Sequence, residues 1–441
     1  MKEALEFIID NFIEISKIIR PSGREINICD YFEDIAKNNN LEVYRDEYNN
    51  ILITKEGNIK SKESLCLVSH LDMIYRKENK KAFDFEKDEI KLLVDNDKIF
   101  SKNTTAGLSS LYALSIMKYI IENNIEMPTI EFLLVSNDEK DKSGIINFDY
   151  SKIKSKKIID LSLDIDKKVA IGAYKNIVLK IHIDPKKLVK MDVDGYEITL
   201  SNAEGNKVDK NTIKELVKCL KYTKVYISEI NSVDSLTCKA KIVTDIEGKD
   251  NLRKNIGLLL PKSLKLDIKN TIVKKYLQLE DSKKLTNLLL ELEQGNINKD
   301  DTLLGNISNI STNNGKITIS YHLKGFDENK LNEIYSLLDE KLNLLKIKFE
   351  KVYEDNKWEE DIDKSKLLKE YKEVYYSLYK KLPEEIIYHG DIDASIIKKH
   401  LNDIEMISIG VNIEDKNKVK ETITIDSLEK ITNILFKLFA K

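Results

Sequence analysis

A histidine and an aspartate two residues apart form the most informative polar pair in this chain. His70 and Asp72 come directly after a continuous apolar run that predicts a buried strand over 64–69. An imidazole at a strand end can bind a metal ion, and a nearby carboxylate can orient the chemistry at that metal. One His-x-Asp segment is weak support by itself, because a histidine at a strand end is more often structural.

Acidic residues follow two further predicted strands. Asp138 and Glu139 come after an apolar run over 129–135, and Asp164 follows one over 157–163. In open α/β sheets, ligands bind at the carboxyl ends of the strands. We therefore expect these acids to converge with the histidine on a single site.

The elements that must position these residues alternate between strand and helix. Apolar strands and a helical pattern over 105–121 predict a doubly wound α/β domain with a buried parallel sheet. From about residue 174 the pattern changes to an α+β unit with helices such as 329–345, and the first pattern returns near the C-terminus. We predict a catalytic-type α/β domain of residues 1–173 plus 356–441, interrupted by an inserted domain of residues 174–355.

The composition is that of a globular protein without a dominant charge. Of 441 residues, 41% are hydrophobic and 33% charged, and the net charge of -3 argues against steering toward nucleic acid or an anionic membrane. Residues 2–18 predict an amphipathic helix, not a signal peptide, and no run reaches the roughly 20 apolar residues of a membrane span. Four scattered cysteines indicate buried thiols in a reducing compartment, so we expect a cytoplasmic protein.

Four short motifs occur in an order that resembles one enzyme family. His-x-Asp-Met, Thr-Thr-x-Gly, Asp-Glu and Leu-Asp follow one another as in the aminoacyl-histidine (cytosol non-specific) dipeptidases, which are related to co-catalytic zinc peptidases. The resemblance implies a zinc-peptidase catalytic domain with an inserted lid that also forms a homodimer. The motifs lie at 70–73, 104–107, 138–139 and 163–164, and flanking segments at 18–23, 82–88 and 396–410 match as well.

The resemblance also implies roles for single residues. His70 and Asp164 correspond to metal ligands, and Asp72 to the carboxylate that orients the metal-bound chemistry. Glu139 corresponds to the general base that takes a proton from metal-bound water. His389 matches a histidine of the family and is expected to line the pocket, although a structural role for it is equally open.

Three of the five metal-ligand positions depart from the family pattern. The bridging aspartate corresponds to Thr105, the glutamate after the general base to Lys140, and the last histidine to Asn417. The histidine-containing turn of the lid corresponds to about 202–206, and a Gly-Leu-Glu-Cys-Gly segment to 391–395.

These replacements remove the charge that two zinc ions need. Asp164 and Lys140 cancel each other, and the other three positions are neutral, so the five positions sum to zero. A catalytic zinc needs about three good protein ligands. We therefore expect no tightly bound cofactor, and we expect the Lys140 ammonium to pair with Asp164, Asp72 or Glu139 in place of a metal.

Three functions remain open from the sequence. The first is a pseudoenzyme that binds a peptide or small ligand. The second is an active metallodipeptidase for Xaa-His or other dipeptides, with an unusual, single-zinc site that recruits Asp138, Asp166 or Asp391. The third is a structural homo-oligomer assembled through the lid.

Overall fold

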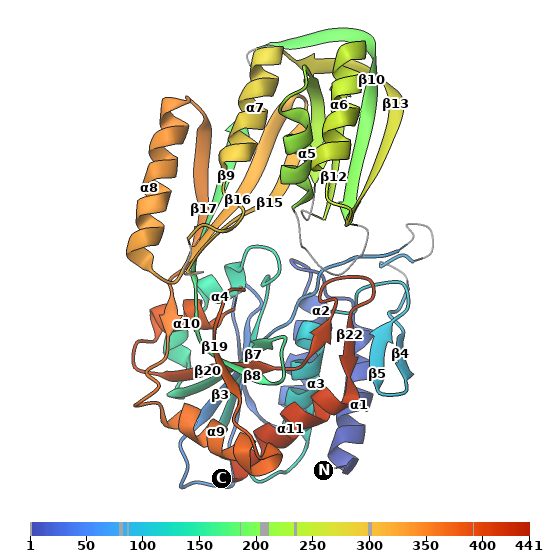
Figure 1. Cartoon of the computed structure of the whole chain (residues 1–441). Coiled ribbons are helices and arrows are strands. Elements are labelled where there is room, and N and C mark those ends of the chain that lie inside the picture. Colours follow the sequence, from blue (N-terminus) through green and yellow to red (C-terminus); the bar gives the residue numbers. More distant parts are fainter. Residues whose placement is uncertain are drawn as a thin grey trace. The chain divides into compact units, whose positions relative to one another are not determined.

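The chain divides into two compact units (Figure 1). Unit 1 comprises Met1–Ala173 and Trp358–Lys441, and unit 2 comprises Tyr174–Lys357. The predicted domains differ from these units only at the second junction, which the sequence placed at 355/356. The computed structural model describes residues 2–78, 83–85, 88–185, 187–202, 211–232, 236–298, 302–390 and 392–441.

The main sheet of unit 1 has the strand order β1-β2-β6-β3-β7-β20-β8-β18, with β19 beside β8. Strands β6, β3, β7 and β20 run parallel, so their carboxyl ends lie at one edge of the sheet. The strands are β1 (Glu42–Arg45), β2 (Ile51–Lys55), β3 (Leu65–His70), β6 (Ile130–Val135), β7 (Lys157–Leu163), β8 (Lys168–Ala173), β18 (Trp358–Glu359), β19 (Glu384–Tyr388) and β20 (Glu405–Gly410).

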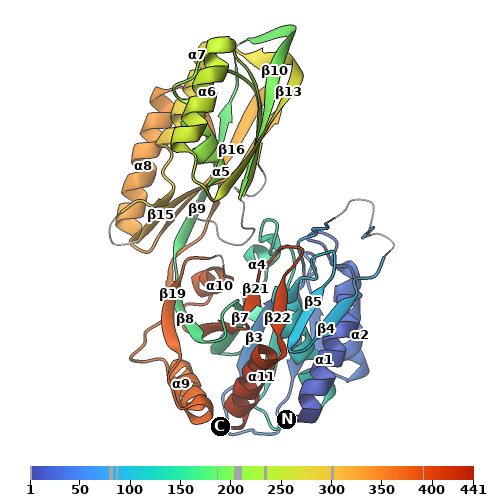
Figure 2. The same cartoon turned by 45° about the vertical axis from the view of Figure 1, so that its right-hand side comes forward.

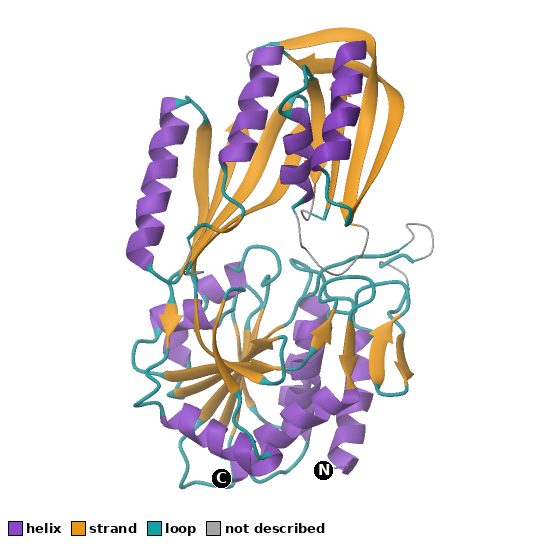
Figure 3. Ribbon diagram, in the orientation of Figure 1, coloured by secondary structure: helices purple, strands orange, loops and turns teal. Residues whose placement is uncertain are grey.

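Helices cover both faces of this sheet (Figure 3). Leu65 and Leu67 of β3 pack in one hydrophobic core, and Cys66 and Val68 pack in another, because successive side chains of a strand point to opposite faces. The first core includes α1 (Lys2–Ser16), α2 (Ile26–Asn38), α3 (Leu108–Glu122), α9 (Lys366–Tyr379) and α11 (Ile425–Ala440), and the second includes α4 (Ser143–Asn147) and α10 (Ala394–His400). The predicted doubly wound α/β fold is confirmed.

A smaller sheet joins two distant parts of unit 1. Its order is β21-β22-β5-β4, and β22 pairs with β5. It brings the C-terminal turn over 415–421 next to the loop that leads into α3, because Glu421 of this turn accepts hydrogen bonds from Ala106 and Gly107 of the loop. The strands are β4 (Leu92–Asp95), β5 (Lys98–Ser101), β21 (Ile413–Glu414) and β22 (Thr422–Thr424).

Unit 2 is an antiparallel sheet covered by helices on one face (Figure 2). Its order is β13-β10-β12-β11-β15-β16-β9-β17, with β14 beside β15. One hydrophobic core contains apolar residues of the sheet and of the helices. The elements are β9 (Lys175–Ile183), β10 (Leu188–Asn202), α5 (Thr212–Leu220), β11 (Tyr226–Ser232), β12 (Thr237–Val243), α6 (Ile246–Leu259), β13 (Leu264–Leu277), α7 (Leu279–Glu291), β14 (Gly295–Asn296), β15 (Leu303–Asn313), β16 (Lys316–Gly325), α8 (Glu328–Leu344) and β17 (Lys348–Glu354).

The inserted α+β unit was thus predicted correctly in class. None of the helices in the described part of the chain has both the length and the apolar character needed to cross a membrane.

Candidate functional site

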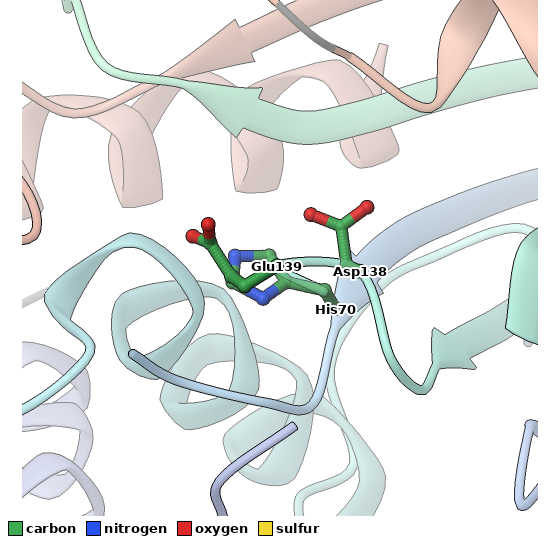
Figure 4. A group of neighbouring side chains, drawn as sticks. All are labelled: His70, Asp138 and Glu139. Atoms are coloured by element: carbon green, nitrogen blue, oxygen red, sulfur yellow. The ribbon is translucent and has the colours of Figure 1, made fainter. Parts of the chain in front are cut away.

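Two neighbouring parallel strands bring His70 close to the acidic pair 138–139. His70 is the last residue of β3 and stands in register with Val135, the last residue of β6. Asp138 and Glu139 follow β6 after only two residues, so they emerge at the same edge of the sheet. One nitrogen of His70 and one oxygen of each of these two acids all lie within 4.8 Å of one another (Figure 4).

A network of hydrogen bonds fixes the ring of His70. Nδ1 lies 3.1 Å from a carboxylate oxygen of Asp72, and Nε2 lies 3.3 Å from the hydroxyl oxygen of Ser109. Asp72 is fully buried and accepts two further bonds, from the Ser22 hydroxyl at 2.6 Å and from the Glu139 N–H at 2.9 Å. The imidazole is therefore held from both sides.

The charges around His70 raise its pKa. Burial lowers the pKa, but the hydrogen bond to Asp72 and the negative charges of Asp138, Asp72 and Glu139 outweigh that effect and raise it to about 9. The acids thus stabilise a positive charge on the imidazole.

Asn417 lies against the acidic pair. Its side-chain amide nitrogen is 3.3 and 3.4 Å from the two carboxylate oxygens of Glu139. Asn417, which the resemblance aligns with the last family histidine, therefore faces the same site as Glu139. An amide that donates to a carboxylate stabilises its charge but does not offer a metal the nitrogen lone pair of an imidazole.

The expected pairing of Lys140 is wrong, and Lys142 provides the buried cation instead. The side chain of Lys142 is 11% exposed and pairs with Asp138 and, at 3.0 Å, with Asp393. Lys140 is exposed and forms no ion pair with any residue that the structure describes. The reason is a tight turn, in which the N–H groups of residues 140, 141 and 142 all point to the carbonyl of Asn137.

Two further buried acids, Asp393 and Asp160, are influenced by the charge of the Lys142 ammonium. Asp393 is 1% exposed, and burial together with the charge of Asp138 raises its pKa well above the usual range. Asp160 of β7 is fully buried, and burial raises its pKa to about 6 although it accepts a hydrogen bond from Ser162. Burial also acts on Asp138, but the charges of Lys142 and His70 outweigh it and lower that pKa. Asp138 is thus ionised beside the Lys142 ammonium, Asp393 favours its protonated form, and Asp160 becomes protonated only below about pH 6.

Thr105 and Asp164 lie outside the His70 group. The hydroxyl of Thr105 donates to the carbonyl of Ile74 at 2.6 Å and accepts from the N–H of Arg76 at 3.0 Å. Asp164 accepts from the hydroxyl of Tyr388 at 3.2 Å, and Lys416 lies 4.0 Å from its other oxygen. Both side chains therefore interact with other groups of the protein.

The remaining candidates are dispersed. Asp166 pairs with Lys430 at 3.5 Å. His389 is exposed in the segment that follows β19. Asp391 lies outside the described residues, as do positions 203–206 of the lid turn and parts of the 82–88 segment.

A buried arginine and a buried glutamate hold the loop before α3. Glu421 accepts from the N–H groups of Ala106 at 2.5 Å and Gly107 at 2.7 Å, and Arg20 donates to the carbonyls of the same two residues at 3.1 Å each. Burial raises the pKa of Glu421 and, although Glu421 opposes it, lowers that of Arg20 to about 10. Because Glu421 also accepts from the Asn417 N–H at 3.2 Å, the turn that carries Asn417 is tied to α3.

Sequence reasoning missed Ser109, Lys142, Asp160 and Glu421. Only Asp160 had a usable signal, since a charged residue inside an apolar strand needs a buried partner. The other three resemble ordinary helix-start, loop and surface residues in sequence.

Comparisons with known proteins show that the fold of the chain is similar to that of peptidases. The chain is 22% identical to the cytosol non-specific dipeptidase of Escherichia coli K12, over 97% of this chain and 96% of that protein. No family model matches the chain. Among solved structures, the aminoacylhistidine dipeptidase of Vibrio alginolyticus is similar with a TM-score of 0.67 at 17% identity, covering 98% of this chain and 96% of that one. An M20 family metallo-carboxypeptidase of Sulfolobus solfataricus has a TM-score of 0.59 at 12% identity, with 98% of each chain covered.

Proposed function

The chain belongs to the family of the cytosol non-specific dipeptidase, and we propose that it binds a peptide or another small ligand without hydrolysing it by a two-metal mechanism. The Lys142 ammonium carries this proposal. It pairs with Asp138, which lies next to His70, and with Asp393. A side chain of the protein thus supplies the positive charge that a metal ion would supply in a metallopeptidase.

The donor set does not fit a two-metal centre. The Thr105 hydroxyl is bonded to the backbone of the 74–76 segment, and Asp164 is bonded to Tyr388 and lies near Lys416. Asn417 offers an amide where the resemblance calls for an imidazole. The two dications of a two-metal site lie about 4 Å apart and need carboxylates to balance their charge. Asp138 is already neutralised by Lys142.

A single-metal dipeptidase is the second candidate, favoured by the close grouping of His70, Asp138 and Glu139. These three side chains would supply an imidazole and two carboxylates, which is the number of protein ligands typical of a catalytic zinc. The metal would supply a Lewis acid and a more acidic water. To bind there, it must displace the Lys142 ammonium from Asp138 and compete with a proton on His70.

A matched pair of lysine variants separates the two candidates. Zinc affinity is measured by titration calorimetry for the wild type, Lys142→Gln and Lys140→Gln, together with hydrolysis of a Xaa-His dipeptide. We expect Lys142→Gln to bind zinc at least about tenfold more tightly than the wild type, because removal of a cation near a metal site is worth a kcal/mol or more. Lys140→Gln should leave the affinity unchanged, since its side chain is exposed.

Zinc-dependent turnover by the wild type that is abolished by Glu139→Gln would overturn the proposal in favour of the single-metal enzyme. A cytoplasmic location and a homodimer formed through unit 2 complete the proposal. The four described cysteines are all buried and free, as suits a reducing compartment.

A further inference from the structure

A cavity of about 660 Å³ lies in unit 1 between α2 and the segment that follows β3. Its volume is within the range of small-molecule sites in proteins, about 300–1,000 Å³. The residues that line it come from 17–34 and 75–89. None of them belongs to the group around His70, so binding in this cavity does not depend on whether the chain hydrolyses peptides.

Stacked aromatic rings line the cavity. The rings of Tyr75 and Phe85 lie face to face, with centroids 4.0 Å apart and 6° between their planes, and Phe83 packs edge-on against Phe85 at 4.9 Å. Tyr31 lines the cavity from α2, where its hydroxyl donates to Glu14 at 2.7 Å. These rings pack on the core of unit 1 but are only partly buried. Rings that are held in place and keep exposed surface can contact a flat apolar group and attract a cation.

Carboxylates outnumber basic side chains around these rings. Four acidic and two basic side chains line the cavity. Asp30 pairs with Arg45 at 2.6 Å, whereas Asp34, Asp88 and Glu89 form no ion pair with any residue in the described ranges. A bound cation would therefore supply a counter-charge that the chain does not provide there.

The spacing of these acids favours an organic cation over a metal ion. Among the described residues, three metal-ligating atoms lie within 4.8 Å of one another only in the group of His70, Asp138 and Glu139. The carboxylates of the cavity therefore do not converge on one point, as the ligands of a metal ion must. Dispersed negative charge beside aromatic rings suits a positive charge that is delocalised over a flat group.

We propose that this cavity binds a small organic cation with a flat apolar body, such as an aromatic amidinium. The apolar body contacts the exposed surfaces of Tyr31, Tyr75 and Phe85, and the cationic end faces the carboxylates of Asp34 and Glu89.

A second cavity of unit 1 provides a comparison within the same molecule. It has a volume of about 490 Å³ and is lined by six acidic side chains and four lysines, with no aromatic residue in the lining that the structure describes. Its own ammonium groups serve its acids, as Lys398 does at 3.4 Å from Glu360. An aromatic cation should therefore bind in the first cavity and not in the second.

The test uses three probes of nearly the same shape that differ in charge. Benzamidine, benzamide and benzoate are titrated into the full-length protein at low salt, and binding is followed by saturation-transfer NMR. We expect saturable binding of benzamidine and binding of neutral benzamide that is weaker by about tenfold or more, because benzamide lacks the positive charge. Benzoate should not bind, since the unpaired carboxylates repel it.

Variants on the two sides of the cavity locate the bound probe. The double variant Asp34→Asn/Glu89→Gln should weaken benzamidine binding about fivefold, because exposed charges contribute modestly. Phe85→Leu should also weaken it, since leucine keeps an apolar side chain but has no aromatic face. Asp361→Asn in the second cavity is the matched control and should leave the affinity unchanged.

Three results would each overturn the inference: no saturable binding of benzamidine, equal binding of the three probes, or equal affinity of the wild type and the double variant for benzamidine. Melting curves establish that the variants are folded. The comparison of probes on the wild type holds even where Phe85→Leu is unstable.

Discussion

At the scale of single residues, the main feature of the site is that buried carboxylates outnumber the buried ammonium groups near them. The Lys142 ammonium pairs with Asp138 and Asp393, and its charge also acts on the buried Asp160. A charged carboxylate without a partner is costly in the interior. Burial raises the pKa values of Asp160 and Asp393, and the consequence is a dependence of stability on pH.

Asp160→Asn should remove part of this dependence. The pKa of Asp160 is about 6 in the folded state, compared with an ordinary value of 3.8. The contribution of this group to the free energy of unfolding of the wild type is therefore fully present below pH 3.8. It is lost as the pH rises through about 6. A shift of about two pKa units corresponds to about 3 kcal/mol at most. Relative to the wild type, the free energy of unfolding of Asp160→Asn should therefore rise between pH 4 and 7.5.

Urea denaturation at both pH values measures this difference. Asp403→Asn is the control, because the side chain of Asp403 is 99% exposed. A difference between Asp160→Asn and wild type that stays constant with pH would contradict the assignment of a raised pKa to Asp160.

At the scale of elements, the loop into α3 depends on residues that lie far away in sequence. Glu421 and Arg20 bind the peptide groups of residues 106 and 107, and α3 then presents Ser109 to His70. Helix ends leave backbone groups without intrahelical partners, and here buried charged side chains satisfy them. The helix start is therefore positioned by the two ends of unit 1 and not by local sequence.

Glu421→Ala should destabilise unit 1 by about 3–5 kcal/mol, because it leaves the buried N–H groups of Ala106 and Gly107 without an acceptor and removes a negative charge that stabilises the buried Arg20 guanidinium. Thermal unfolding measures the loss, and hydrogen exchange should accelerate at the amides of Ala106 and Gly107. Glu414→Ala is the matched control from the neighbouring strand. Glu414 is 56% exposed and pairs with an exposed Lys98, so its loss should cost less than about 1 kcal/mol. Equal effects of the two variants would refute the positioning role.

The elements of the main sheet could be predicted, whereas the turns that follow them could not. Apolar runs located β3, β6 and β7 to within a residue, because burial on both faces leaves a continuous signal. Whether Lys140 or Lys142 becomes the buried cation depends on a turn in which Asn137 and Lys142 both have positive φ. The spacing of hydrophobic residues in the sequence does not predict such a turn. The pairing of Glu421 with residues 106 and 107 depends on tertiary structure and has no local signature.

At the scale of the whole molecule, unit 2 offers an edge for self-association. Among the described strands, β13 pairs only with β10, so one side of this long strand is open. Its side chains include Ile268 and Ile272, which are 36% and 57% exposed. Open edge strands with apolar side chains favour pairing with a second chain.

We expect a homodimer in solution, measured by light scattering coupled to size-exclusion chromatography. Ile272→Lys should shift the population toward the monomer, because a charge at an apolar strand edge opposes edge-to-edge pairing. Leu258→Lys on α6 is the control, since Leu258 is 72% exposed and lies outside that strand. A wild-type monomer at micromolar concentration would contradict the expectation.

The central proposal is that the Lys142 ammonium supplies, at Asp138, the positive charge that a metal ion would otherwise provide. The most direct measurement is the zinc content of the wild-type protein after saturation with zinc and gel filtration, determined by plasma mass spectrometry. The account predicts far less than one zinc per chain for the wild type and an increase for Lys142→Gln. One or two zinc ions per wild-type chain, retained through gel filtration, would contradict it.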